Sequence, residues 1–269
     1  MAQGTIMHKT LAWLAILSAI PVAVASAADM PVKAPLMPLA PAAAADWTGL
    51  YLDVDGGWQK ESYNWFYPAP GLGFPAFQLS SSGGVLGGHV GYQQQFNWLV
   101  VGVEAGISAP TNGRAAISSP TAVAFTPPCG FAVGTTCQVN AGDVSTLGGK
   151  LGVAWQDWLV YGVGGVARGA VGNTQTILAS GAVNDSTNGQ NHTGWYAGAG
   201  LDFMTVKTQL VDLILGVEYE HIDLGTVQEC QQFGGATFCF PAVSGERNIG
   251  TKEDIVWGKL TLKFNLFGH

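Results

Sequence analysis

Two pairs of polar side chains could activate water if the fold brought them together. Asp53 and Asp55 lie one residue apart, and so do His221 and Asp223 much later in the chain. An acid pair facing a His/Asp pair is an arrangement with which a protease can take a proton from attacking water. The alternation described below places His221 on the face opposite to Glu218, so we expect these groups not to converge. Charged residues of strands and of their rims are the simpler interpretation.

Histidines could also serve an esterase or an acyltransferase that acts on lipid. Such an enzyme needs a nucleophile such as serine beside a histidine. Neither His89 nor His192 belongs to a Ser/His/acid pattern of recognisable spacing. We therefore predict no catalytic residues, no cofactor and no turnover.

The four cysteines form two local pairs, Cys129 with Cys137 and Cys230 with Cys239, each inside a polar stretch. The chain is predicted below to be secreted, and secreted chains cross an oxidising compartment, so two local disulfides are the favoured connectivity. Each would close a loop of about ten residues and stabilise the protein by roughly 2 to 3 kcal/mol in the chain-entropy model. A zinc site would need closer thiols or nearby histidines, so we predict no metal site.

The N-terminus has the three parts of a cleaved secretory signal. A basic start precedes an apolar run from Leu11 to Ala25, and small residues follow up to Ala28. A retained membrane anchor is the alternative, but the run is short for a span and contains Pro21 near its end. We predict that residues 1–27 are a signal peptide, cleaved near Ala27/Ala28.

The remaining chain divides into a linker and one domain. Residues 28–45 are mostly Ala and Pro, and repeated proline favours an extended, solvated segment. We predict a periplasmic linker there. Residues 46–269 are enough for a single domain.

Composition limits the class of that domain. Glycine accounts for 38 of 269 residues, charged residues for only 11%, and the formal net charge is −7. After the signal there is no window of about 18 consecutive apolar residues, which each helical membrane span would need. A soluble acidic protein rarely combines so much glycine and aromatic residue with so little charge. A membrane β-barrel does, because its curved strands tolerate glycine and its outer face meets lipid.

Alternation of apolar and polar residues in segments of about ten residues is the main structural signal. Eight such segments occur. Their predicted apolar faces carry Leu50, Leu52, Val54 and Trp58; Leu86, Val90, Tyr92 and Phe96; Leu99, Val101, Val103, Ala105 and Ile107; Leu147, Leu151, Val153 and Trp155; Leu159, Tyr161, Val163 and Ala167; Trp195, Ala197, Ala199, Leu201 and Phe203; Leu213, Leu215, Val217 and Tyr219; and Val256, Leu260, Leu262, Phe264 and Leu266.

The connections between the segments alternate in length. Long links run through about 60–81, 109–141, 171–191 and 225–250, whereas the others, such as Asn97-Trp98 and Gln156-Asp157, are only a few residues long. An outer-membrane barrel with an even number of strands has short periplasmic turns and long external loops. We therefore predict an all-β fold: an antiparallel, eight-stranded, up-and-down transmembrane β-barrel with four long extracellular loops that contain both cysteine pairs.

The polar faces of the segments carry sparse charges among glycines. They are Asp53, Glu104, Lys150, Arg168, Glu218, Lys259 and Lys263. A soluble β-sandwich or lipocalin-like barrel is the alternative, but its solvated face would be richer in polar residues. An eight-stranded barrel is just wide enough inside for side chains, so we predict an interior network of ion pairs. A narrow path for ions is the other interpretation of the same residues.

Aromatic residues gather where the segments begin or end. They are Trp47, Trp58, Trp98, Trp155, Trp158, Trp195, Phe203 and Phe267. Because such rings prefer the headgroup zone of a bilayer, we predict that they form girdles at the two membrane interfaces.

Several short motifs resemble the outer-membrane β-barrel proteins of alphaproteobacteria, which are related to opacity-type surface proteins. The matching stretches are Asp46-Trp47-Thr48-Gly49-Leu50-Tyr51 after a PVKAP-type linker, Gly87-Gly88-His89-Val90-Gly91-Tyr92-Gln93, Gly149-Lys150-Leu151-Gly152-Val153-Ala154-Trp155, Thr193-Gly194-Trp195 with Gly198-Ala199-Gly200, and Glu218-Tyr219 with Asp223-Leu224-Gly225. Their order and spacing cover nearly the whole mature chain. One departure is that Phe267 is followed by Gly268-His269, whereas such barrels often end on an aromatic residue that the insertion machinery reads.

The resemblance implies a barrel in the outer membrane of a Gram-negative cell, with a structural or surface-interaction role in the envelope. A narrow porin-like channel for ions or small solutes is the alternative. The expected partners are outer-membrane lipid and lipopolysaccharide, the barrel-insertion machinery and an unidentified surface ligand, with no nucleic acid.

Overall fold

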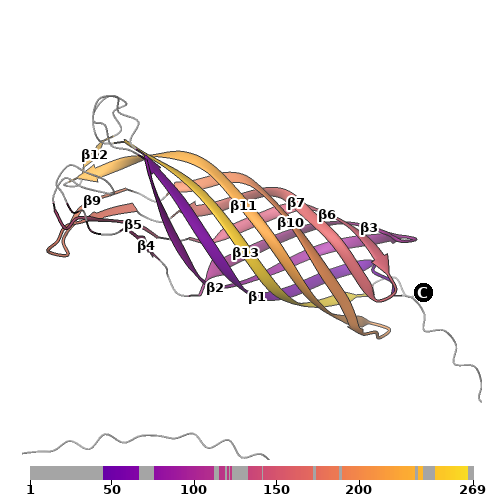
Figure 1. The fold of residues 1–269 in the computed structure, drawn as a ribbon. Helices are drawn as coiled ribbons and strands as arrows, with labels where there is room; N and C mark the ends of the chain where they lie inside the picture. The colour runs from indigo at the N-terminus through magenta and orange to yellow at the C-terminus, as the bar shows by residue number, and fades with distance from the viewer. Residues whose placement is uncertain are drawn as a thin grey trace, which may run out of the picture. The chain divides into compact units, whose positions relative to one another are not determined.

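The protein forms a single ring of antiparallel strands in the computed structural model (Figure 1). The structure describes residues 45–66, 76–111, 115–118, 120, 122, 133–140, 142–171, 174–187, 190–233, 236–238 and 246–265. The predicted signal peptide and most of the predicted linker lie outside these residues. Among the described residues, no helix is long and apolar enough to cross a membrane.

Eight long strands make the ring. They are β1 (Gly49–Phe66), β2 (Phe77–Phe96), β3 (Leu99–Pro110), β6 (Val144–Trp155), β7 (Trp158–Val171), β10 (Gln190–Val206), β11 (Val211–Phe233) and β13 (Glu246–Phe264). Each pairs with the next in this order, and β13 pairs with β1 to close the ring. The predicted eight-stranded antiparallel barrel is thus confirmed, and ring closure leaves no free edge among these strands.

Tight turns join strands at one end of the ring. Asn97 and Gln156 have positive φ angles of 61° and 54°, in the left-handed region that asparagine adopts more readily than most residues. They lie in the two short links that the sequence predicts, between β2 and β3 and between β6 and β7. These links are confirmed as hairpin turns.

The outer face of the ring carries an apolar belt. Leu52, Val103 and Leu262 are 48%, 62% and 39% exposed, although each is hydrogen-bonded within a strand of the ring. The next residue along each of these strands, Asp53, Glu104 or Lys263, is polar and buried inside the ring. Exposed aliphatic side chains on every strand form a belt of the kind that contacts hydrocarbon in membrane barrels.

Strand β7 reverses the predicted orientation. Leu159, Tyr161 and Val163 are buried in the interior, whereas Val160 and Val166 are exposed on the outer face. Apolar residues occupy both faces of this strand, so alternation alone does not distinguish them. The register with β6 and β10 fixes the orientation instead, and the prediction for this segment was wrong.

The strands extend further at the other end than the sequence indicates. β1 continues to Phe66 and β11 to Phe233, through stretches predicted as loops. Beyond the apolar belt the outer face needs no hydrophobic residues, so the signal used to recognise strands disappears there although the hydrogen bonding continues.

A second sheet is built on these extensions. Its strands are β4 (Ala115–Ile117), β5 (Thr136–Asn140), β8 (Thr174–Ile177), β9 (Val183–Thr187) and β12 (Ala236–Phe238), and they connect to the ring through β11. Figure 1 shows them gathered at the end opposite to the tight turns. The predicted long loops therefore contain ordered strands.

Glycines inside the ring make room for aromatic rings. A Cβ atom at Gly91 would lie 2.4 Å from Cζ of Tyr51, and a Cβ at Gly200 would lie 2.4 Å from Cζ of Tyr161. Real Cβ atoms do not approach so closely. The glycines that the sequence shows on the inner faces therefore let tyrosine side chains lie flat across the neighbouring strands and fill the interior.

Residues 45–48 close the end with the tight turns. Trp47 is fully buried and belongs to the same hydrophobic cluster as Leu159 and Ile214. Its backbone NH donates to Gln95 Oε1 at 2.8 Å, and Gln93 Nε2 donates to its carbonyl at 2.8 Å. The prediction of Trp47 as an interface aromatic was wrong, because the segment before β1 turns into the ring instead of along its surface.

The other predicted girdle tryptophans lie on the outer face. Trp98, Trp155 and Trp158 are exposed at the end with the tight turns, where Trp158 also contacts Phe203 with ring centroids 4.5 Å apart. Trp58 is exposed towards the other end. Trp195 on β10 is also exposed. Phe267 lies outside the described residues.

Candidate functional site in the barrel interior

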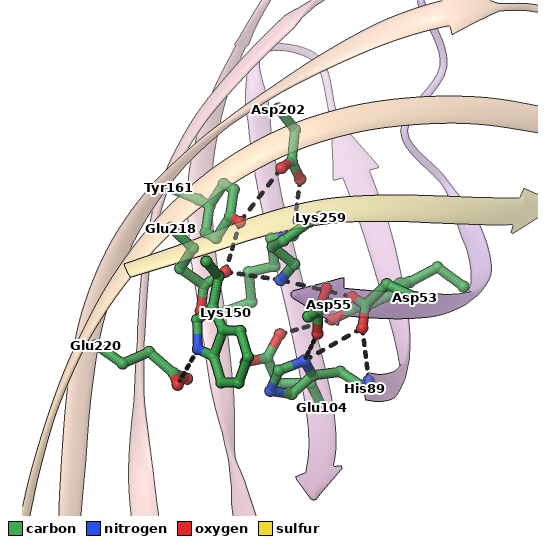
Figure 2. A network of polar contacts seen from close by, with 12 residues as sticks. Asp53, Asp55, His89, Glu104, Lys150, Tyr161, Asp202, Glu218, Glu220 and Lys259 are labelled. Carbon is green, nitrogen blue, oxygen red and sulfur yellow. Dashed lines mark hydrogen bonds and ion pairs between the residues drawn. The ribbon is translucent and has the colours of Figure 1, made fainter. Parts of the chain in front are cut away.

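The centre of the ring holds a network of charged side chains (Figure 2). Six of the seven predicted interior residues are buried inside the ring, namely Asp53, Glu104, Lys150, Glu218, Lys259 and Lys263. Arg168 is exposed on the outer face. Its placement in the network was wrong because it rested on the inverted orientation of β7.

Lys259 on β13 is the centre of the network. Its Nζ donates to Glu218 Oε2 at 2.7 Å and lies 3.5 Å from Asp53 Oδ2. Glu218 is on β11 and Asp53 is on β1, the two strands that flank β13. A single ammonium therefore links three neighbouring strands.

Lys150 and Tyr161 connect this centre to the opposite wall. The Tyr161 hydroxyl donates to Glu218 Oε2 at 2.6 Å and lies 3.2 Å from Asp202 Oδ1. Lys150 Nζ lies 3.3 Å from Asp202 Oδ2 and 3.7 Å from the centroid of the Tyr161 ring. It is also 5.1 Å from the Tyr51 ring, on the far side of the barrel. These contacts include cation–π geometry and cross the whole width of the interior.

A compact group lies where β1 meets β2. His89 Nδ1 is 3.1 Å from Asp53 Oδ1 and 2.7 Å from Asp55 Oδ2, and the His89 backbone NH donates to Asp53 Oδ1 at 2.5 Å. All three residues are buried. The sequence places them on inner faces but gives no reason to group His89 with the acid pair, because the pairing depends on the register between the strands.

Two more carboxylates complete the central layer. Tyr51 donates its hydroxyl hydrogen to Glu104 Oε2 at 2.8 Å, and Trp257 Nε1 donates to Glu220 Oε2 at 2.7 Å. Asp202 and Glu220 also belong to the network, although they are not among the predicted interior residues. The alternation of inward and outward residues along β10 and β11 is the signal that could have predicted both as interior residues.

Acidic groups outnumber basic ones among the buried residues of the described part. The lysines are Lys150, Lys259 and Lys263, and the carboxylates are Asp53, Asp55, Glu61, Glu104, Asp202, Asp212, Glu218, Glu220 and Glu253. Lys263 lies away from the centre and pairs there with Asp212, with Nζ 3.0 Å from Oδ2. The interior therefore carries a strong excess of carboxylates, which the sequence analysis did not anticipate.

The residues weighed as a protease centre do not converge. Asp53 and Asp55 are inside the ring, whereas His221 and Asp223 are on the outer face of β11. His221 Nδ1 is 2.8 Å from Asp254, and Asp223 is 3.0 Å from Lys252 Nζ. The residues weighed as a lipid esterase, His89 and His192, are buried in the interior and do not reach the lipid-facing surface.

Each predicted disulfide has one cysteine among the described residues and one outside them. Cys137 belongs to β5 and is buried, and Cys230 belongs to β11. Cys129 and Cys239 lie outside the described residues, so both pairings stay predictions.

The closed antiparallel ring, its apolar outer belt and its polar filled interior define a small membrane-spanning β-barrel. A family described as "Outer membrane protein beta-barrel domain" matches residues 32–238. The chain belongs to this family and is an outer-membrane β-barrel protein.

Solved barrels resemble the chain at low sequence identity. Neisserial surface protein A is 12% identical, with 81% of this chain and 98% of that chain covered and a TM-score of 0.35. Ail of Yersinia pestis is 11% identical, with 78% and 99% covered and a TM-score of 0.33. OprG of Pseudomonas aeruginosa is 14% identical, with 81% and 97% covered and a TM-score of 0.40. No curated protein matches the chain in sequence.

Proposed function

We propose that the protein is a closed barrel that anchors an extracellular sheet in the outer membrane, with a structural or surface-interaction role and no turnover. The observation that carries this proposal is the set of side chains that cross the interior. Lys150 on β6 contacts Asp202 on β10 and approaches Tyr51 on β1, so its contacts reach both sides of the ring.

Apolar layers on either side of the network support a closed interior. Towards the tight turns, Trp47 and Val100 are fully buried. Towards the other end, Tyr63, Trp65 and Ile249 form a hydrophobic cluster with Val139 of the second sheet. Water-filled channels have polar walls along their whole length, whereas this interior alternates between apolar and polar layers.

The second sheet offers a surface for contact. Ile117 and Val183 are 57% and 52% exposed on its strands, and Val133 in the turn before β5 is 60% exposed, although all three lie beyond the belt that faces lipid. Exposed apolar residues outside the membrane are a feature of surfaces that bind partners. We assign the unidentified surface ligand to this sheet, and lipid and lipopolysaccharide to the belt and its rim. Kinship with alphaproteobacterial, opacity-type proteins rests on the sequence motifs.

Conductance distinguishes the closed barrel from the channel. The excess of interior carboxylates favours a cation path if the interior opens. We expect the refolded protein to give no steady unitary currents in planar bilayers. Tyr161→Ala removes the aromatic side chain at the centre of the network and is expected to introduce cation-selective currents. Val160→Ala, on the lipid face of the same strand, is the matched control and is expected to introduce none. Steady currents from the unmodified protein would exclude the closed-barrel role.

The orientation is tested on intact cells. An epitope inserted at Ser180, in the exposed turn between β8 and β9, is expected to bind antibody on whole cells. The same epitope inserted at Asn97 is expected to bind only after the outer membrane is permeabilised. The reverse pattern would place the second sheet in the periplasm and would contradict the surface role.

A further inference from the structure

Two carboxylates and an imidazole lie close together in the barrel interior. One ligand atom from each of Asp53, Asp55 and His89 lies within 4.8 Å of the others. Figure 2 shows all three side chains pointing towards one another from β1 and β2. We propose that these residues bind one divalent transition-metal cation, with Zn²⁺ as the reference ion.

The distances suit a metal with small adjustments. His89 Nδ1 is 3.1 Å from Asp53 Oδ1 and 2.7 Å from Asp55 Oδ2. Zinc binds imidazole nitrogen and carboxylate oxygen at about 2.0 to 2.2 Å, so tetrahedral ligands lie roughly 3.3 to 3.6 Å apart. Side-chain rotations that widen the two contacts by less than about 1 Å create the site, and the metal takes the place of a proton on Nδ1.

A second observation, independent of this spacing, comes from Asp55. This residue is fully buried, and its Oδ1 has no hydrogen-bond partner. A buried carboxylate oxygen without a partner costs free energy. A proton on His89 satisfies Oδ2 alone, whereas a cation that both oxygens of Asp55 approach also compensates Oδ1.

The neighbouring groups hold the ligands in place. Asp53 uses Oδ2 to face Lys259 and accepts the backbone NH of His89 on Oδ1. Such contacts to outer groups orient metal ligands in proteins. β1 and β2 are hydrogen-bonded on both sides of this point, with Leu52 opposite Val90 and Asp55 opposite Gly87, so the backbone of the site is rigid.

The charge of the central layer favours a cation despite the nearby ammonium. Lys150 and Lys259 are the lysines there, and they face six buried carboxylates, namely Asp53, Asp55, Glu104, Asp202, Glu218 and Glu220. Glu104 Oε1 and Glu220 Oε1 also have no hydrogen-bond partner. A dication reduces the excess negative charge that a low-dielectric interior makes costly.

The donor set indicates the class of metal. One imidazole with two carboxylates suits zinc, manganese and related first-row ions, whereas calcium and magnesium prefer oxygen ligands alone. The site is enclosed by the apolar layers, so we expect uptake to accompany refolding.

Metal content of the refolded protein tests the proposal. The unmodified protein, refolded with Zn²⁺ and freed of excess metal, is expected to retain one zinc ion per chain by elemental analysis. The variants Asp55→Asn and His89→Gln are expected to lose it. His221→Gln is the control, because His221 pairs with Asp254 on the outer face, and this variant is expected to keep the ion. Loss in His221→Gln with retention in His89→Gln would overturn the proposal.

Spectroscopy of the unmodified protein keeps the test valid if the variants fail to fold. Refolding with Co²⁺ is expected to give d–d absorption of a four- or five-coordinate site, and X-ray absorption of the zinc form is expected to show nitrogen and oxygen ligands that include one imidazole. No uptake, a sulfur ligand or a shell of oxygen alone would each refute it.

Discussion

At the level of single residues, we expect the loss of Lys259 to cost more than the loss of a lysine from an ion pair on the surface. Lys259 is buried between Glu218 and Asp53, so its removal leaves two carboxylates in a medium that solvates them poorly. The contrast is with Lys252, whose side chain is 49% exposed beside Asp223. Both lysines are on β13, and they differ chiefly in burial.

We predict that Lys259→Ala lowers the free energy of unfolding by about 3 to 5 kcal/mol, because a buried charge pair is broken. Lys252→Ala is expected to cost less than about 1 kcal/mol, as exposed pairs do. Urea unfolding in detergent, followed by the heat-modifiable shift in gel migration, measures both. Equal effects of the two variants would contradict the buried network.

The inner glycines give a second test at this scale. We predict that Gly91→Ala destabilises the barrel by about 1 to 3 kcal/mol, the usual cost of overpacking, because its Cβ would meet the Tyr51 ring at 2.4 Å. Gly56→Ala is the control, since its nearest contact would be Leu86 at 3.8 Å. Thermal unfolding of the two variants compares them directly, and an unaffected Gly91→Ala would mean that Tyr51 lies elsewhere.

At the level of elements, strand parity predicted most of the barrel but not all of it. It identified both faces of β1, where Leu52 and Asp53 alternate cleanly. It failed for β7, where Val160 and Val163 are equally apolar and only pairing with neighbours decides which points inward. It also could not group His89 with Asp55, because contacts between strands depend on register and not on sequence spacing. Trp47 was wrongly assigned to the membrane interface because it precedes the first strand, where alternation does not tell inside from outside.

The apolar belt predicts that the cost of a charge on the outer face depends on its position along a strand. Val54→Arg is expected to make folding into bilayers less favourable by about 2 to 4 kcal/mol, because it places a charge at the centre of the lipid-facing belt, which runs on β1 from Leu50 to Trp58. Asn64→Arg, on the same face of β1 but beyond the belt, is expected to change it little. Folding titrations into lipid vesicles measure the difference. Similar costs at both positions would indicate that the belt is misplaced.

At the level of the whole molecule, the two ends of the domain meet at one place. Lys263 near the end of β13 donates to the backbone carbonyls of Asp46 and Thr48, and Asp46 to Thr48 lead directly into β1. These bonds form only when the last strand has joined the first. A chain whose last strand has not yet paired with β1 therefore lacks these contacts, so Trp47 is not yet held across this end of the ring. Pairing of the last strand with the first and closure of this end of the interior are therefore coupled, and we expect the interior to close only after β13 has joined β1.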